Sequence, residues 1–168
     1  HGYMGGKYNA QQRRQRAAYA KGAPHLAIPA EVIDIPFDGD SFPANLRVPN
    51  TDGPAPCVMI TCGGDSTKEE FHTLENEFLK RGVATCAYDG PGQSLTMLKW
   101  RIRPDWEVPV GALIDVLEAR PEIDGERMQS VPGGTHWGGG IQISTFDHAR
   151  FGLFVHRDGV WDGQRLLP

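Results

Sequence analysis

The sequence predicts an α/β fold with a mainly parallel sheet, an N-terminal antiparallel hairpin and crossover helices. Residues 57–62 and 83–88 are short apolar segments bounded by turn residues, as strands buried on both faces usually are, and residues 127–131 are expected to form the next strand. Helical patterns lie between these segments, and this alternation is typical of a parallel sheet. We therefore expect right-handed crossover connections between the three strands.

The chain divides into three parts. Residues 1–30 form a helical and irregular segment, whose three arginines are expected to lie on a solvated helix face. Residues 31–131 carry the predicted sheet, and the turn of its first hairpin is expected at Asp38-Gly39. Residues 132–168 show no helical or strand period and are interpreted as an irregular tail.

Two helices are expected to cross over the sheet. In the first, Thr67 and Glu70 have the spacing of a capping box. The predicted apolar face of this helix contains Phe71, Leu74, Phe78 and Leu79. The second helix is expected to begin near Pro104. Its predicted apolar stripe contains Val108, Leu113, Ile114 and Leu117.

The composition argues against several classes of function. The 168 residues carry 17 basic and 21 acidic side chains, and a net charge of −4 argues against a nucleic-acid partner. No run of 18 apolar residues is present, so we expect no membrane-spanning helix. The three cysteines lack metal-site spacing, which indicates reduced thiols in a cytoplasmic protein. No charged and then apolar segment opens the sequence, so we expect no secretory leader. No motif predicts a metal or another cofactor.

The end of the first apolar strand carries the first candidate site residues. Ligands of an open α/β sheet bind beyond the carboxyl ends of its strands. There the amides of Gly63 and Gly64 can form an oxyanion hole, while a tight turn that needs glycine is the alternative interpretation. Asp65 and Ser66 follow and are expected to line the cleft.

The end of the second apolar strand carries the other candidates. Its turn, residues 89–93, contains Asp89 and Gln93, which we expect to line the same cleft. A surface turn is the alternative interpretation of this segment. Cys62 also lies at a strand end, and we expect it to be a buried, inert thiol.

Three motifs, in order, resemble one known family. Residues 65–72 (DSTKEEFH), 89–93 (DGPGQ) and 102–107 (IRPDWE) are similar to the FrsA-like, DUF1100-type branch of the α/β-hydrolases. The resemblance extends over residues 17–128. That branch includes esterase-like proteins and hydrolases that cleave carbon–carbon bonds.

The resemblance implies a partial α/β-hydrolase fold and a serine hydrolase that acts on an ester or activated carbonyl compound. A serine on a G-x-S-x-G elbow would follow the strand at residues 127–131. The amides of Gly63 and Gly64 would stabilise the oxyanion. The implied partner is a small molecule with an ester or carbonyl group, and the acid and histidine of the triad would come later in the chain.

The sequence departs from the family pattern in three places. The oxyanion loop is one residue shorter than usual between Gly64 and Asp65. Ser94 and Leu95 stand where the family commonly has glycine and glutamate. No G-x-S-x-G occurs anywhere in the chain, and residues 131–139 read VPGGTHWGG where the elbow is expected.

A shifted reading frame would explain the missing elbow. If this stretch were read one base out of frame, its codons would permit the sequence Gly-x-Ser-Leu-Gly-Gly. We therefore hypothesise a frameshift upstream of Pro132. The chain as written would then contain only the N-terminal part of the domain, and we expect little or no hydrolase activity from it. The alternative is a non-catalytic α/β domain that binds a partner or a small molecule. An incomplete sheet would expose an edge, which favours a homo-oligomer.

Overall fold

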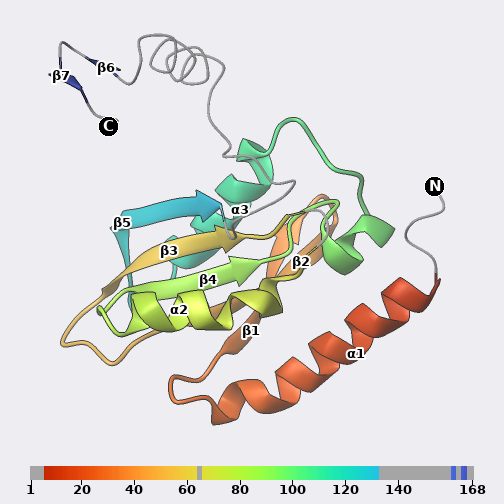
Figure 1. The fold of residues 1–168 in the computed structure, drawn as a ribbon, viewed down its shortest axis with the longest axis horizontal. Helices are drawn as coiled ribbons and strands as arrows, with labels where there is room; N and C mark the ends of the chain where they lie inside the picture. Colours follow the sequence, from red (N-terminus) through yellow and green to blue (C-terminus); the bar gives the residue numbers. More distant parts are fainter. Residues whose placement is uncertain (1–5, 64–65, 133–159, 162–163, 166–168) are drawn as a thin grey trace.

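The computed structural model describes residues 6–63, 66–132, 160–161 and 164–165. Five strands form one mixed sheet in the order β1-β2-β4-β3-β5 (Figure 1). The strands are β1 (Glu31–Phe37), β2 (Asp40–Arg47), β3 (Ala55–Thr61), β4 (Ala84–Tyr88) and β5 (Ile123–Pro132). A separate short pair consists of β6 (Val160–Trp161) and β7 (Gln164–Arg165). Nearly all of the predicted tail, 132–168, lies outside the described residues.

Three α-helices and three 3₁₀ turns connect the strands. The α-helices are α1 (Gly6–Gly22), α2 (His72–Leu79) and α3 (Glu107–Glu118). The 3₁₀ turns are η1 (Ala23–His25), η2 (Lys68–Phe71) and η3 (Ser94–Leu98). No helix in the described part of the chain is long and apolar enough to cross a membrane.

The predicted hairpin is confirmed. Strands β1 and β2 pair in antiparallel fashion, with Phe37 opposite Asp40 at the turn end. The two residues between them, Asp38 and Gly39, have φ values of 49° and 76°. Positive φ at both turn positions matches the right-handed twist of the strands, so this short turn closes the hairpin without splaying it.

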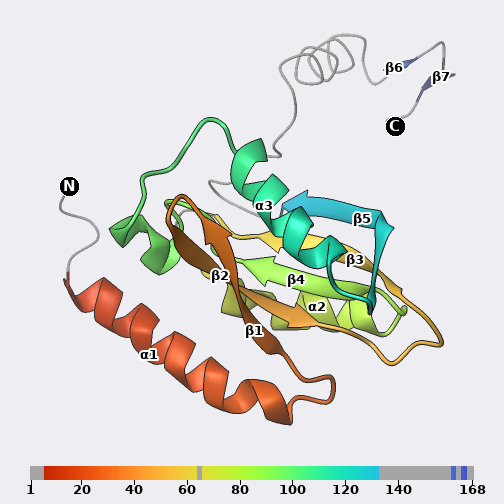
Figure 2. The same ribbon diagram turned by 180° about the vertical axis from the view of Figure 1, so that it is seen from behind.

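The mainly parallel sheet is also confirmed. Strand β3 pairs in parallel with β4 on one side and with β5 on the other, while β2 joins β4 in antiparallel fashion. The two crossovers lie on opposite faces, with α2 in front of the sheet in Figure 1 and α3 in front in Figure 2. The chain passes from β3 to β4 on one side and then returns past β3 to β5 on the other, so the carboxyl end of β3 lies at a topological switch point.

Each face of the sheet has its own apolar core. The core under α3 is the larger, and in it Leu113 and Leu117 are fully buried against β1, β2, β3 and β4. The core under α2 is smaller and consists of Val58, Ile60, Cys62, Phe71 and Ala87. The alternation of residues along β3 between the two cores follows from the two-residue period of a strand.

The predicted capping box of the first crossover helix is wrong, although Thr67 stands at the N-cap position of the helical segment. Thr67 makes no capping hydrogen bond, and its Oγ1 instead accepts one from Gln15 Nε2 of α1 at 3.0 Å. The segment then opens with the 3₁₀ turn η2 before α2 begins at His72. A partner 52 residues away in sequence has replaced the local cap.

Two predicted core positions are also wrong. Leu74 is 37% exposed, while Glu75 beside it is 1% exposed and pairs with Arg47 of β2. Val108 is 49% exposed because it lies in the first turn of α3, before the helix reaches the sheet. The remaining predicted face residues of both helices are buried or partly buried against the cores.

Candidate functional site at the carboxyl ends of β3 and β4

The loops that follow β3 and β4 are joined by one side chain, that of Gln93. Its Oε1 accepts a hydrogen bond from the Gly90 amide at 2.8 Å. Its Nε2 donates to the Cys62 carbonyl and lies 3.2 Å from Thr61 Oγ1. Gln93 therefore fixes the turn after β4 against the end of β3.

The turn at residues 89–93 requires both of its glycines. A Cβ on Gly90 would lie 2.8 Å from Trp106 Cζ2, well inside contact distance. Gly92 has a φ of 84°, and a Cβ there would overlap the backbone of Ile102. The segment therefore packs as a buried loop, and the surface-turn alternative does not hold.

Ser94 follows this turn in an uncommon backbone conformation. Its φ is 46°, in the left-handed region that glycine adopts without steric cost, and the residue is buried. A side chain in that region costs about 1–2 kcal/mol. The glycine that the resembled family commonly has here would carry no such cost, so the turn keeps its conformation at the expense of strain.

The side chain of Asp89 also connects the loops that follow β3 and β4. Its Oδ1 accepts a hydrogen bond from the Lys68 amide at 2.9 Å and another from the Cys62 thiol, with Sγ at 3.5 Å. Its Oδ2 lies 3.6 Å from Lys68 Nζ. Burial raises the pKa of the Asp89 carboxyl, and the nearby ammonium group of Lys68 opposes that shift. Asp89 is 1% exposed and thus holds the start of η2 against the end of β3.

Gly63 already uses its amide within the loop after β3. The N–H donates a hydrogen bond to Ser66 Oγ at 3.2 Å. Gly64 and Asp65 lie outside the described residues. The oxyanion-hole assignment to Gly63 and Gly64 therefore stays a prediction, and so does the assignment of Asp65 and Ser66 to the cleft lining.

The cysteines are buried thiols. Cys57, Cys62 and Cys86 are all free and buried. Burial raises the pKa of Cys57 to about 12 and that of Cys62 far above its ordinary value. A thiol with so high a pKa is a poor nucleophile at neutral pH, as expected for Cys62.

The contacts of α1 with this region were not predicted from the sequence. Arg16 Nη2 lies 4.0 Å from Asp89 Oδ2, and Gln15 holds Thr67. The polar pattern of α1 predicted a solvated face, and nothing in that pattern distinguishes a residue that contacts a distant loop. Among the described residues no cluster of His, Cys, Asp and Glu could hold a metal ion.

The sheet order, the switch point and the two joined loops are those of a partial α/β-hydrolase fold, and the solved relatives agree. Residues 8–152 match the family described as Esterase FrsA-like, so the chain belongs to that family. The crystal structure of the 2,6-dihydroxy-pseudo-oxynicotine hydrolase superposes with a TM-score of 0.70 at 37% identity, covering 72% of this chain and 34% of that one. AbyA5 shares the fold, with a TM-score of 0.61 and 20% identity over 73% of this chain and 35% of its own.

Relatives known from sequence are also hydrolases. The 2,6-dihydropseudooxynicotine hydrolase of Paenarthrobacter nicotinovorans is 42% identical over 106 residues, which is 63% of this chain and 29% of that protein. Hydrolase ORFZ of Pyricularia oryzae is 30% identical over 164 residues, covering 89% of this chain and 39% of that protein. The chain thus spans about three tenths to two fifths of the length of these two relatives. The predicted family resemblance is confirmed.

Proposed function

We propose that this chain carries the oxyanion-loop side of a serine hydrolase site that acts on an ester or an activated carbonyl compound, carbon–carbon bonds included. The observation that carries the proposal is the Gln93 bridge, which holds the turn after β4 against the end of β3 at the switch point. Asp89 and Lys68 form further contacts between these two loops. Family membership supports the reaction class.

The register of the sheet supports a nucleophile position beside this junction. Strand β5 runs parallel to β3, and its last residue, Pro132, lies opposite Thr61 at the end of β3. A serine there would attack the carbonyl carbon and pass its proton to a histidine. The carbonyl oxygen would become an oxyanion, which the amides after β3 would stabilise. The alcohol or carbon leaving group would depart with a proton, and water would then release the acyl group.

In the free protein the Gly63 amide is already occupied and is not available to an oxyanion. Because the Gly63 N–H donates to Ser66 Oγ, this hydroxyl must turn away before Gly63 can donate to an oxyanion. A rotation about χ1 of serine is enough for that change. Gly63 would then act as a donor in the transition state more than in the ground state, which is where such a bond accelerates a reaction.

A second candidate function is a non-catalytic α/β binding domain. The absence of G-x-S-x-G from the 168 residues favours it, because the family chemistry needs an elbow serine. For the chain as written we accordingly propose no turnover. A shifted frame upstream of Pro132 is the proposed origin of the altered elbow.

The deciding experiment reads the source DNA over codons 125–145 and assays the 168-residue chain with p-nitrophenyl butyrate and a fluorophosphonate probe. A base change that restores Gly-x-Ser-Leu-Gly-Gly, together with no turnover and no labelling, supports the hydrolase proposal. An intact frame with no labelling favours the binding domain. Turnover by the chain as written would contradict the claim that it lacks a nucleophile.

Partners and location are part of the same proposal. The substrate is a small molecule with an ester or carbonyl group, and a second copy of the chain is the expected protein partner. A cytoplasmic location is supported by the three free, buried thiols. Sedimentation of the purified chain measures the oligomeric state, and a monomer at all concentrations would contradict the homo-oligomer.

A further inference from the structure

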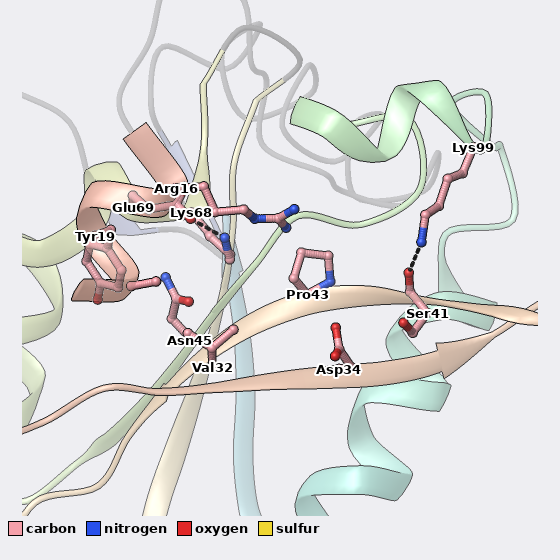
Figure 3. A pocket seen from close by; sticks show the side chains of 11 residues that line it. Arg16, Tyr19, Val32, Asp34, Ser41, Pro43, Asn45, Lys68, Glu69 and Lys99 are labelled. Atoms are coloured by element: carbon pink, nitrogen blue, oxygen red, sulfur yellow. Dashed lines mark hydrogen bonds and ion pairs between the residues drawn. The ribbon is translucent and has the colours of Figure 1, made fainter. Parts of the chain in front are cut away.

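A pocket of about 290 Å³ lies between α1 and the β1–β2 hairpin, on the face of the sheet opposite α3 (Figure 3). Strand side chains form its floor, among them Val32, Pro43 and Asn45. Arg16 and Lys68 close it from above. We propose that this pocket binds a small neutral molecule through a carboxamide or lactam group, an inference that goes beyond the proposed hydrolase reaction and requires no nucleophile.

The first support is the side chain of Asn45. It is 1% exposed, yet neither its Nδ2 nor its Oδ1 has a hydrogen-bond partner among the described residues. Figure 3 shows its amide pointing into the pocket, between Tyr19 and Lys68. A buried amide without partners is costly, and native proteins keep few of them without a functional reason.

Asn76, on α2, shows how a partly buried amide is satisfied elsewhere in this fold. Asn76 Oδ1 accepts a hydrogen bond from Arg47 at 2.9 Å, and its Nδ2 lies 3.1 Å from His72 Nε2. Both ends of that amide are used within the protein. Neither end of the Asn45 amide is used within the described part of the protein.

The chemistry of the occupant follows from this pair of groups. A primary amide presents a donor and an acceptor side by side, so the complementary edge has an acceptor and a donor side by side. Carboxamides and lactams carry that edge. Arg16 Nη2 makes no hydrogen bond to the described residues and lies 4.0 Å from Asp89 Oδ2, so it can add a further donor for a carbonyl oxygen. Val32 and Pro43 provide apolar surface for the body of the molecule.

The charges around the pocket favour a neutral occupant over an anion. Lys68 pairs with Glu69 and Asp89. Lys99 pairs with Asp40 at 2.7 Å. Arg16 lies 4.0 Å from Asp89 Oδ2, and the carboxylate of Asp34 also lines the pocket. A free carboxylate would therefore find little uncompensated positive charge.

An adjoining hollow sets the length of molecule that fits. It has a volume of about 220 Å³ and shares Arg16, Ser41, Pro43 and Lys99 with the pocket. Leu95 and Leu98 add apolar lining there. A planar ring attached to the amide group can therefore extend from Asn45 past Pro43.

The test is a titration of the ¹⁵N-labelled 168-residue chain with benzamide, followed by NMR. Methyl benzoate lacks the N–H donor, and benzoate carries a charge, so these two probes separate shape and charge from the amide edge. We expect benzamide to shift resonances of α1 and the hairpin and to bind at least tenfold more tightly than either other probe. Equal binding of methyl benzoate, tighter binding of benzoate, or no saturable shift with benzamide would overturn the proposal.

Variants then locate the site. Asn45→Leu should weaken benzamide binding at least tenfold, whereas the matched change Asn50→Leu, at an exposed loop position, should leave it unchanged. Asn45→Leu should also unfold at the same or a higher temperature, because it removes two buried atoms that lack partners. Val32→Trp, at a half-exposed position on the pocket floor, should block binding without touching a core. Benzamide binding that survives both Asn45→Leu and Val32→Trp would overturn the assignment.

Discussion

The two faces of the sheet are buried by different chemistry. Under α3 the large core is apolar throughout and contains the fully buried Leu113 and Leu117. The other face, under α1 and α2, buries Arg47, Lys68, Glu75 and Asp89, each 1% exposed. The first face stabilises the fold through apolar burial. On the second face the cost of burying charged groups offsets part of that stabilisation, and these groups lie beside the candidate site.

The polar face is held together mainly by Arg47. Its guanidinium donates to the Ile28 carbonyl at 3.1 Å and to Asn76 Oδ1 at 2.9 Å, and it lies 3.4 Å from Glu75 Oε2. Thr85 Oγ1 donates to the other Glu75 oxygen at 3.2 Å. Burial nevertheless raises the pKa of the Glu75 carboxyl, so its partners offset only part of the lost hydration.

The largest expected effect comes from breaking this group. Arg47→Ala should lower the free energy of unfolding by about 4 kcal/mol, because Glu75 is left buried without its cation. Urea denaturation followed by circular dichroism measures the loss. The double variant Arg47→Met/Glu75→Leu removes both charges and should recover most of the stability. A double variant as unstable as the single one would contradict this account of the polar face.

A cavity in the apolar face should have a somewhat smaller effect. Leu117→Ala should lower the free energy of unfolding by about 3 kcal/mol, through lost burial and the cavity left behind. Leu98→Ala, at a position 53% exposed, serves as the matched control in the same denaturation experiment. Equal losses for the two variants would mean that α3 does not cover a close-packed core.

A substitution at the turn after β4 should stabilise the protein. Ser94→Gly should raise the free energy of unfolding by about 1 kcal/mol, because glycine adopts the φ of 46° without a steric cost. Ser94→Ala keeps the Cβ and should change little. Thermal unfolding measures both variants, and a glycine variant less stable than the alanine variant would show that the serine is not strained.

The smallest expected effect is a change in pH dependence. The pKa of Asp89 is raised in the folded protein, so the folded state keeps this proton at pH values where the unfolded chain has lost it. The contribution of Asp89 to the free energy of unfolding should therefore fall as the pH rises from about 4 through the raised pKa. Asp89→Asn should flatten that decline in denaturation curves measured between pH 4 and 8. An unchanged pH profile would mean that Asp89 is not the responsible group.

The sequence by itself determined the local elements and the family. Residues 57–62 and 83–88 were predicted as buried strands and residues 127–131 as a further strand, and strands lie over most of each range. The turn at Asp38-Gly39 was predicted from residues that tolerate positive φ. These predictions succeeded because strand burial and turn conformation depend on neighbours close in sequence. The same holds for the ordered motifs that indicated the hydrolase family.

The tertiary structure alone decided which polar residues are buried and what they contact. Glu75 replaces Leu74 in the interior because Arg47, 28 residues earlier, supplies its partner. The capping box at Thr67 gives way to Gln15 of α1. The pocket around Asn45 exists only where α1 lies over the hairpin. Each of these features depends on a pair of groups far apart in the chain, and a local pattern of residues contains no information about such a partner.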